Sequence, residues 1–253
     1  MTSDMTSSRT RAVLVTGAAS GIGAAITERL VADGAQVLAV DLSPDPDGAG
    51  QPFAADLATR EGNRAAVEEA LARFGRLDAV VANAGFQHVS PVFDFEEDRW
   101  EALLAVLLTS PFLLAKYAWP ALADSGDGRF LAVASVHGLV ASPFKAGYVS
   151  AKHGVLGLVK TLALEGAAVG IRAMALCPGY VRTPLVEQQI ADQAAAHGIS
   201  PERVLREVML DRQAVKELIE PADVAAAAAF FLGPAGAAFT GVAIPMDQGW
   251  LAH

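Results

Sequence analysis

The sequence offers little for a disulfide, a metal cluster, a basic binding surface or a membrane anchor. Cys177 is the one cysteine among 253 residues, which excludes an internal disulfide and a cysteine-based metal site and fits a reducing compartment. Lysine and arginine number 19 against 28 aspartates and glutamates, the net charge is -9, and no basic run occurs. Nucleic acids and anionic membranes are therefore not expected as partners, whereas small molecules are.

Targeting and membrane-spanning patterns are also missing. The opening stretch "MTSDMTSSRT" is polar and lacks the apolar core of a signal peptide, so we predict a flexible tail over residues 1–10. The run "VAAAAAFFLG" is too short to cross a bilayer and is predicted to be a buried helix. We expect a cytoplasmic protein without membrane contact.

The composition and the order of elements favour a large α/β core. Hydrophobic residues make up 53% of the chain and charged residues 19%, which is typical of a folded globule. Strand-like runs alternate with helical segments, which predicts an α/β, doubly wound parallel sheet (a Rossmann fold). No linker divides residues 11–253, so we predict one domain, with a small helical substrate lid at about residues 180–220. The strand-like runs are "RAVLVT", "QVLAVD", "LDAVVAN", "RFLAVAS" and "IRAMALC".

A glycine-rich turn follows the first strand-like run and opens the next helix. In "TGAASGIG", from Thr16 to Gly23, the glycines permit a tight turn and let backbone N–H groups approach a pyrophosphate. A strand before the turn and a helix after it are the context that dinucleotide binding requires. The cofactor contacts predicted here are Gly17, Ser20, Gly21, Ile22 and Gly23.

Residues at the ends of later strands extend this predicted cofactor site. Asp41 closes the second strand, where a carboxylate accepts hydrogen bonds from a ribose hydroxyl and repels a 2′-phosphate, which favours NAD over NADP. Asp56 and Leu57 end the third strand, where a place near the adenine and a plain turn are both open interpretations. The "NAG" motif of Asn83, Ala84 and Gly85 ends the fourth strand at the same edge of the sheet.

A phenol and an ammonium group share one helix face in "YVSAK". Tyr148 and Lys152 are four residues apart, so their side chains are neighbours if this stretch is helical. A nearby cation favours phenolate, and the tyrosine is then expected to act as a general base or acid near neutral pH. Ser135 ends the strand "RFLAVAS", and its hydroxyl is expected to hold the reacting oxygen. Each residue alone also fits a core, solvated or capping role, but their joint placement after a dinucleotide turn indicates catalysis.

Taken together, "TGAASGIG", "NAG", Ser135 and "YVSAK" resemble the short-chain dehydrogenase/reductase family, over a stretch from about Ala12 to Gly249. The resemblance implies that Tyr148 moves the hydroxyl proton and that Ser135 orients the substrate oxygen. It also implies that Lys152 lowers the tyrosine pKa and holds the nicotinamide ribose, so that Tyr148 and Lys152 both contact the cofactor. "PGYVRTP" resembles the family's nicotinamide loop and adds Pro178, Val181 and Thr183 as cofactor contacts.

The loop before the predicted base points to an anionic substrate. Lys145 lies three residues before Tyr148, and the loop is otherwise apolar apart from His137 and Ser142, so lysine and histidine donors could fix a carboxylate. A solvated lysine and a capping histidine remain alternative interpretations. "GFQHV", "SVHGLVASPFKAGY", "CPGYVRTPLVEQQI" and "QGW" resemble the D-3-hydroxybutyrate dehydrogenases within the family. That implies NAD-dependent oxidation of a short 3-hydroxy acid, with the carboxylate on Gln87, His137, Lys145 and Gln189 and the apolar tail against Trp250.

Two positions depart from these patterns and keep other functions open. Leu107 stands where the family has an asparagine that supports a water relay, and leucine can neither bind water nor donate a hydrogen bond. We therefore predict an altered or slow proton route. Tyr180 stands where the subgroup tends to have tryptophan. The alternatives are a polyol, sugar or 3-oxoacyl thioester substrate, or an NAD-binding sensor whose catalysis has decayed.

Two predicted helices have more apolar surface than a single sheet face can cover. The segments 100–119 and 151–169 are apolar on more than one side, which indicates deep burial or pairing with another subunit. The family resemblance implies a homotetramer.

Overall fold

Seven short strands form one parallel sheet. The strands are apolar because helices cover both faces of the sheet. The computed structural model describes residues 10–252, with the side chains at 192, 193 and 195–197 excepted, so the predicted tail over residues 1–10 lies outside the described residues apart from residue 10. The strand order is β3-β2-β1-β4-β5-β6-β7, and every pairing is parallel. The strands are β1 (Ala12–Thr16), β2 (Gln36–Asp41), β3 (Gln51–Ala54), β4 (Ala79–Ala82), β5 (Gly128–Val133), β6 (Ile171–Pro178) and β7 (Ala243–Met246).

Helices connect the strands and confirm the predicted doubly wound topology. A π-helical turn, Ala105–Thr109, joins α3 to α4, and a short 3-10 helix, Val136–Gly138, follows β5. The α-helices are α1 (Gly21–Ala32), α2 (Arg60–Phe74), α3 (Glu97–Leu104), α4 (Ser110–Asp124), α5 (Ala146–Gly166), α6 (Pro184–His197), α7 (Pro201–Val204) and α8 (Pro221–Leu232).

Local sequence signals set several helix ends. The Thr59 side chain accepts a hydrogen bond from the Gly62 N–H at 3.0 Å and so begins α2. That helix ends at Gly75, whose φ of 68° is the left-handed conformation that glycine adopts without penalty. Thr183 caps α6 in the same way, with Pro184 as the first helical residue. These ends place the loops at the sheet edges.

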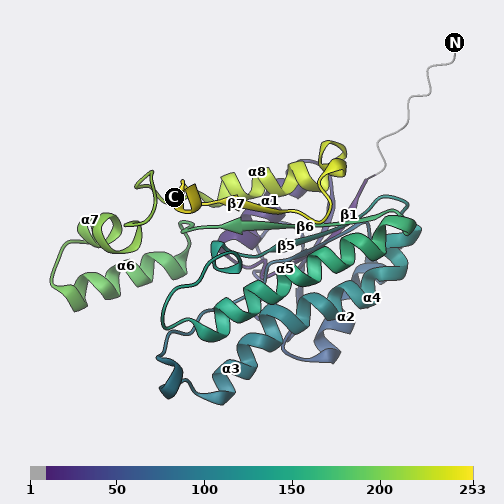
Figure 1. Ribbon diagram of the computed structural model, residues 1–253. Coiled ribbons are helices and arrows are strands. Elements are labelled where there is room, and N and C mark those ends of the chain that lie inside the picture. The colour runs from purple at the N-terminus through teal and green to yellow at the C-terminus, as the bar shows by residue number, and fades with distance from the viewer. Residues whose placement is uncertain (1–9, 253) are drawn as a thin grey trace, which may run out of the picture.

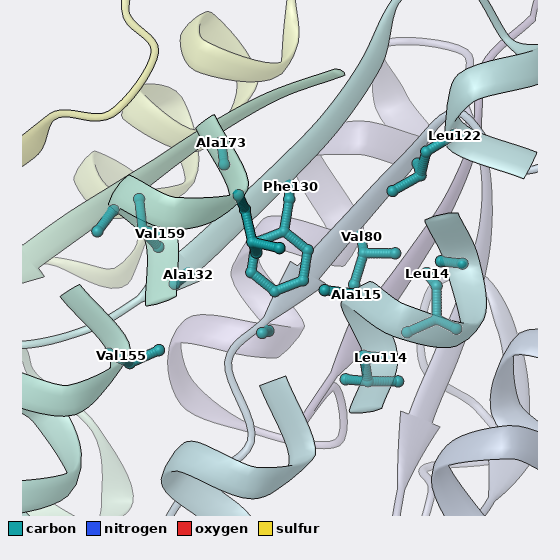
Figure 2. Close-up of a cluster of buried hydrophobic side chains, with 14 of the residues drawn as sticks. Leu14, Val80, Leu114, Ala115, Leu122, Phe130, Ala132, Val155, Val159 and Ala173 are labelled. Carbon is teal, nitrogen blue, oxygen red and sulfur yellow. The ribbon is translucent and has the colours of Figure 1, made fainter. Parts of the chain in front are cut away.

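The core has two layers, one on each face of the sheet. In Figure 1, α1 and α8 lie on one face of the sheet, and α2, α4 and α5 lie on the other. Figure 2 shows the second layer, where Leu14 and Val80 from the strands meet Leu114 from α4, with Phe130 at the centre. These side chains are at most 1% exposed. Burial on both faces explains why the strands read as nearly continuous apolar runs.

The carboxyl ends of the strands form the edge where a ligand is expected. The chain leaves β1 toward β2 on one side, and β4 lies on the other side of β1, so the crevice between these two connections is a topological switch point. Beyond this edge α6 and α7 extend away from the sheet (Figure 1). They have a small core of their own, with Ile190, Val204, Met209 and Leu210 buried. The region predicted as a lid is therefore helical.

Two features of the fold were not predicted from the sequence, namely the last strand of the sheet and one long apolar helical segment. The strand β7 pairs with the end of β6, and its Pro245 and short length gave no clear strand pattern. Within residues 10–252, one helical segment, Glu97–Asp124, is long and apolar enough by length and composition to cross a membrane. Its second half, α4, packs Leu114 and Ala115 into the core of the sheet.

Candidate active site

A cavity of about 420 Å³ opens at the carboxyl ends of the strands. Its wall combines the glycine-rich turn, the end of β5, the start of α5 and the base of α6, so segments far apart in the sequence meet there. Most of the predicted site residues line it. They are Gly17, Ser20, Gly21, Ile22, Asp41, Asn83, Gly85, Gln87, Ser135, His137, Lys145, Tyr148, Lys152, Thr183, Gln189 and Trp250.

The glycine-rich turn is packed so closely that side chains do not fit. Gly17 has a φ of 65°, and a Cβ there would lie 2.8 Å from the Ala84 Cα atom. A Cβ on Gly23 would lie 1.9 Å from the Gly17 carbonyl oxygen. These approaches hold the N-terminus of α1 against the cavity, where its free N–H groups and the helix dipole attract an anion. The turn is therefore a cradle of the shape that a pyrophosphate requires.

A hydrogen-bond network ties this turn to the "NAG" motif. The Asn83 side-chain amide donates to the carbonyl oxygens of Thr16 at 2.9 Å and of Gly17 at 3.2 Å. In return the Thr16 hydroxyl accepts the backbone N–H groups of Asn83 at 3.0 Å and Ala84 at 3.1 Å. Thr16 is 1% exposed and was not singled out from the sequence, although it directly precedes Gly17 in the motif. Asn83 therefore fixes the backbone that surrounds the cofactor site.

Asp41 lies where the ribose of a dinucleotide is expected. Its carboxylate accepts the backbone N–H of Ala19 at 3.1 Å and of Ser43 at 3.1 Å, which fixes it beside the turn. It also lines the cavity, so it has acceptor capacity left for hydroxyl groups. The cradle and this acceptor fit a nicotinamide dinucleotide, and Ser20, Gly21 and Ile22 would supply its phosphate contacts.

Six predicted cofactor residues do not line the cavity. Leu57 is 6% exposed in the core, and Asp56 is exposed and accepts the Ala58 N–H at 2.9 Å, as in a plain turn. Val181 is 4% exposed and pairs with Ile219 in an isolated bridge, so its side chain packs toward α8. The other three, Gly23, Ala84 and Pro178, support the neighbouring backbone.

The three predicted catalytic residues do converge. Ser135 follows two residues after the end of β5, and its hydroxyl lines the cavity together with the phenol of Tyr148, the third residue of α5. The Lys152 Nζ atom lies one turn further along α5, 5.6 Å from the centre of the Tyr148 ring, and donates to the Val133 carbonyl oxygen at 2.8 Å. All three side chains line the cavity. This arrangement can move a proton to and from a substrate oxygen.

That Lys152 lowers the pKa of Tyr148 stays a prediction, and burial acts in the opposite direction here. Burial raises the pKa of Tyr148, and the hydrogen bond from Ser135 opposes that rise. The Lys152 ammonium faces the Val133 carbonyl instead, and burial lowers its own pKa to about 8. Acidification of the tyrosine therefore requires further positive charge in the site, such as that of an oxidised nicotinamide ring.

The opposite side of the cavity is aromatic with one ammonium group. Tyr180 and Trp250 stack with ring centres 5.8 Å apart, and the His137 ring packs edge-on against Trp250 at 5.6 Å. The Lys145 Nζ atom lies 5.9 Å from the centre of the Tyr180 ring. Burial lowers the pKa of Lys145, which means that its charged form gains from an anionic partner. This wall suits a small carboxylate with a short apolar tail.

Two amide side chains meet above this wall. The Gln189 Nε2 atom on α6 donates to the Gln87 Oε1 atom at 3.2 Å, although the two residues are 102 positions apart in the chain. Both line the cavity. The helical segment that contains α6 thus contacts the loop after β4 through a pair of groups that can each also bind a carboxylate.

Leu107 makes the floor of the cavity apolar near the catalytic helix. It lies in the π-helical turn, is 2% exposed and packs with Leu103 and Ala151 beside Tyr148. A Cβ on Gly85 would lie 2.7 Å from its Cδ2 atom, so leucine fills the space next to the "NAG" motif. Leu107 is therefore a packed apolar contact, and the altered proton route stays a prediction.

Sequence reasoning missed several residues that line the site. Tyr180 was noted only as a departure, and its stacking on Trp250 could not be predicted because the two residues belong to different loops. Apolar residues of the wall gave no signal at all. They are Phe86, Val133, Ala134, Val136, Leu185 and Val186, with Gly179 and Pro184 beside them.

With this geometry established, comparison with known proteins defines the class. The family model described as short chain dehydrogenase matches residues 11–194. The chain belongs to the short-chain dehydrogenase family of oxidoreductases, which implies a nicotinamide cofactor. The fold agrees, since the aldohexose dehydrogenase of Thermoplasma acidophilum superposes with a TM-score of 0.89 at 27% identity, over 97% of this chain and 95% of that chain.

Within the family, the chain is similar over its length to particular enzymes. It is 42% identical to the D-beta-hydroxybutyrate dehydrogenase of Rhizobium meliloti, over 96% of this chain and 100% of that protein. It is 39% identical to the enzyme of that name from Cupriavidus necator, over 96% of this chain and 98% of the relative. The cis-4-hydroxycyclohexanecarboxylate dehydrogenase of Sinomonas cyclohexanicum is 32% identical, over 96% of this chain and 97% of that protein.

Proposed function

We propose that the protein oxidises a short 3-hydroxy acid, such as 3-hydroxybutyrate to acetoacetate, with NAD as the hydride acceptor. The observation that carries this proposal is the half-buried ammonium of Lys145, three residues before Tyr148, in a wall that also contains the stacked rings of Tyr180 and Trp250. Such a group stabilises a carboxylate at a fixed distance from the reacting hydroxyl. The names of three relatives agree, because each acts on a hydroxy acid.

The chain's own residues supply binding and proton transfer. Lys145 holds the carboxylate by charge, and the amides of Gln87 and Gln189 donate to it once their mutual hydrogen bond opens. Trp250 and Tyr180 enclose the short tail. His137 forms part of this wall, and the hydrogen bonds of its ring decide whether it also donates to the carboxylate.

At the reacting carbon, Tyr148 takes the proton of the substrate hydroxyl while Ser135 donates a hydrogen bond to the same oxygen. When bound, NAD supplies the hydride acceptor and a positive ring that favours the phenolate. Lys152 is proposed to hold the nicotinamide ribose, and its ammonium group lines the cavity beside Tyr148. Leu107 makes the cavity wall beside these groups apolar.

NAD rather than NADP is proposed on the position of Asp41. A carboxylate fixed beside the glycine-rich turn accepts hydrogen bonds from ribose hydroxyls and repels a 2′-phosphate. We further propose that residues 11–253 act as one domain, because one sheet contains every strand found within residues 10–252.

A homotetramer in the cytoplasm is the proposed working state. Large apolar side chains lie exposed on the outer faces of α4 and α5 and around α8, which supports burial against other subunits. They are Phe112 at 47% and Leu164 at 81% exposure, with Phe230 at 45% and Phe239 at 37%. Light scattering after size-exclusion chromatography tests the tetramer, and a monomeric mass would contradict it.

The test of the function is an NAD-coupled assay with 3-hydroxybutyrate, longer 3-hydroxy acids, and neutral polyols and sugars. We expect NADH formation with 3-hydroxybutyrate, and a loss of at least about a thousandfold in kcat for Tyr148→Phe with NAD binding retained. Turnover of neutral alcohols alone would favour the polyol alternative. NAD binding without turnover on the whole panel would favour a sensor.

A further inference from the structure

The His137 ring lies between two serine hydroxyl groups. Its Nδ1 atom is 3.5 Å from the Ser135 Oγ atom, and its Nε2 atom is 2.9 Å from the Ser142 Oγ atom. The ring also packs edge-on against Tyr148, with centres 6.0 Å apart, and against Trp250 at 5.6 Å. The ring is 5% exposed and packs against Tyr148 and Trp250, with one serine hydroxyl beside each of its nitrogens.

The ring has one proton to place at neutral pH. Burial lowers the pKa of His137 to about 4, and the charges of Lys145 and His153 act in the same direction. A neutral imidazole donates from one nitrogen and accepts at the other. Other groups that face the ring are the hydroxyls of Ser135 and Ser142, the phenol of Tyr148 and the indole of Trp250. The choice of tautomer therefore determines what Ser135 can do.

Ser135 has one hydroxyl proton and several neighbours. Its Oγ atom accepts the His137 backbone N–H at 3.1 Å, and it lies 3.5 Å from the Pro178 carbonyl oxygen. If the Nδ1 atom of His137 were bare, it would compete for the hydroxyl proton that Tyr148 and the substrate oxygen need. If the Nδ1 atom is protonated, it becomes a second donor to Ser135, and the hydroxyl proton is directed to the reaction centre.

We propose that Ser142 is a positioning residue for Ser135, acting through His137: its hydroxyl donates to the Nε2 atom, so that the proton of the ring sits on the Nδ1 atom facing Ser135. This rests on the proposed function, in which Ser135 donates to the substrate oxygen. In this tautomer the Nε2 atom is an acceptor, so His137 does not donate to the carboxylate, which is left to Lys145, Gln87 and Gln189. Ser142 is partly exposed and outside the cavity wall, so it acts only through the ring.

Nitrogen NMR of the full chain tests the tautomer directly. The five histidines are labelled with 15N, and the His137 signals are assigned with His137→Asn, in the complex with NADH at neutral pH. We expect a pyrrole-type shift for the Nδ1 atom and a pyridine-type shift for the Nε2 atom, and in Ser142→Ala a mixture of the two tautomers. A wild-type ring protonated on the Nε2 atom would overturn the proposal and return His137 to the role of carboxylate donor.

Kinetics provide the second measurement. Ser142→Ala should lower kcat about 5- to 10-fold with the KM for NAD unchanged, because one oriented hydrogen bond to the reacting oxygen is weakened. Ser142→Thr keeps the hydroxyl and should restore kcat, and Ser150→Ala, an exposed serine on α5, is the matched control. An unchanged kcat in Ser142→Ala would contradict the proposal.

The two failures can be told apart. The tautomer is read without turnover, and kcat is measured on whichever alcohol of the assay panel is oxidised, so a wrong substrate class leaves both readouts intact.

Discussion

The two halves of the cavity are built by different means. On the cofactor side, the shape comes from main-chain atoms: Gly17 and Gly23 approach backbone so closely that no side chain fits, and Asn83 ties the turn to the next strand. On the substrate side, the shape comes from long side chains of separate loops, with Tyr180 stacked on Trp250 and Lys145 above them. The first half is rigid and common to many ligands, whereas the second half can be changed one side chain at a time.

The charges of the two halves also differ. Asp41 places a carboxylate at the ribose end of the cavity, and Lys145 places an ammonium group at the substrate end. Under the proposed function, an acceptor for hydroxyls at one end and a cation for a carboxylate at the other would fix the direction in which NAD and a hydroxy acid lie. Changes on the cofactor side should therefore affect every substrate, and changes on the substrate side should affect some more than others.

The largest effect is expected from crowding the backbone cradle. Gly17→Ala places a Cβ 2.8 Å from the Ala84 Cα atom at a φ of 65°. The affinity for NAD should therefore fall more than about 100-fold, and kcat/KM should fall with every substrate. Gly34→Ala is the matched control, because its φ of 88° is equally unfavourable but its Cβ meets nothing within 4 Å. Fluorescence titration with NADH checks both. Equal losses in the two variants would show that strain alone, and not the cradle, is responsible.

The second largest effect is expected on the preference for NAD over NADP. Asp41→Ser removes the charge that repels a 2′-phosphate, so we expect the ratio of kcat/KM for NAD over NADP to fall about 30- to 100-fold. Steady-state kinetics with both cofactors measure it. An unchanged ratio would place the ribose away from this carboxylate.

A smaller gain is expected where the chain departs from its family. Leu107→Asn restores an amide to the π-helical turn beside Tyr148, and kcat should rise severalfold as the proton route reopens. Because the new amide is buried, the free energy of unfolding should fall by about 1–3 kcal/mol. Paired kcat and urea unfolding measurements test both. A fall in kcat at unchanged KM would show that this helix no longer takes part in proton transfer.

These positions also show how far sequence reasoning reaches. The strand-helix alternation was sufficient for the fold, and "TGAASGIG", "NAG" and "YVSAK" located the cavity wall, because main-chain geometry is recorded in contiguous motifs. On the substrate wall, the loop sequence alone indicated Lys145 and His137, whereas Gln87, Gln189 and Trp250 were predicted only through resemblance. The side chains of Val181 and Leu57 are buried in the core and do not face the cavity. The sequence could not predict this, because their motifs do not specify which of two neighbouring residues faces the ligand. The direction of the Lys152 ammonium group, toward the Val133 carbonyl oxygen, could not be predicted because the spacing from Tyr148 gives only its helix face.

The smallest expected effect is the contribution of His137 to the pH dependence of the free energy of unfolding. Its pKa is about 4 in the folded chain and near its ordinary 6.5 when unfolded, so the unfolded state binds more protons between these values. Stability is complete above about pH 6.5 and is lost as the pH falls toward 4, with a loss of about 2 kcal/mol between pH 7 and pH 5. Urea unfolding at both pH values checks this. His137→Gln should reduce the loss by that amount, and an unchanged slope would mean that the ring is not buried as described.

The central claim is that one ammonium group selects a carboxylate beside a tyrosine base. The most direct measurement is the ratio of kcat/KM for 3-hydroxybutyrate over the neutral 1,3-butanediol, in the wild type, Lys145→Ala and the exposed control Lys160→Ala on α5. We predict that Lys145→Ala lowers this ratio about 100-fold, mainly through the hydroxy acid, and that Lys160→Ala leaves it unchanged. An equal loss for both substrates, or no loss for 3-hydroxybutyrate, would contradict the account.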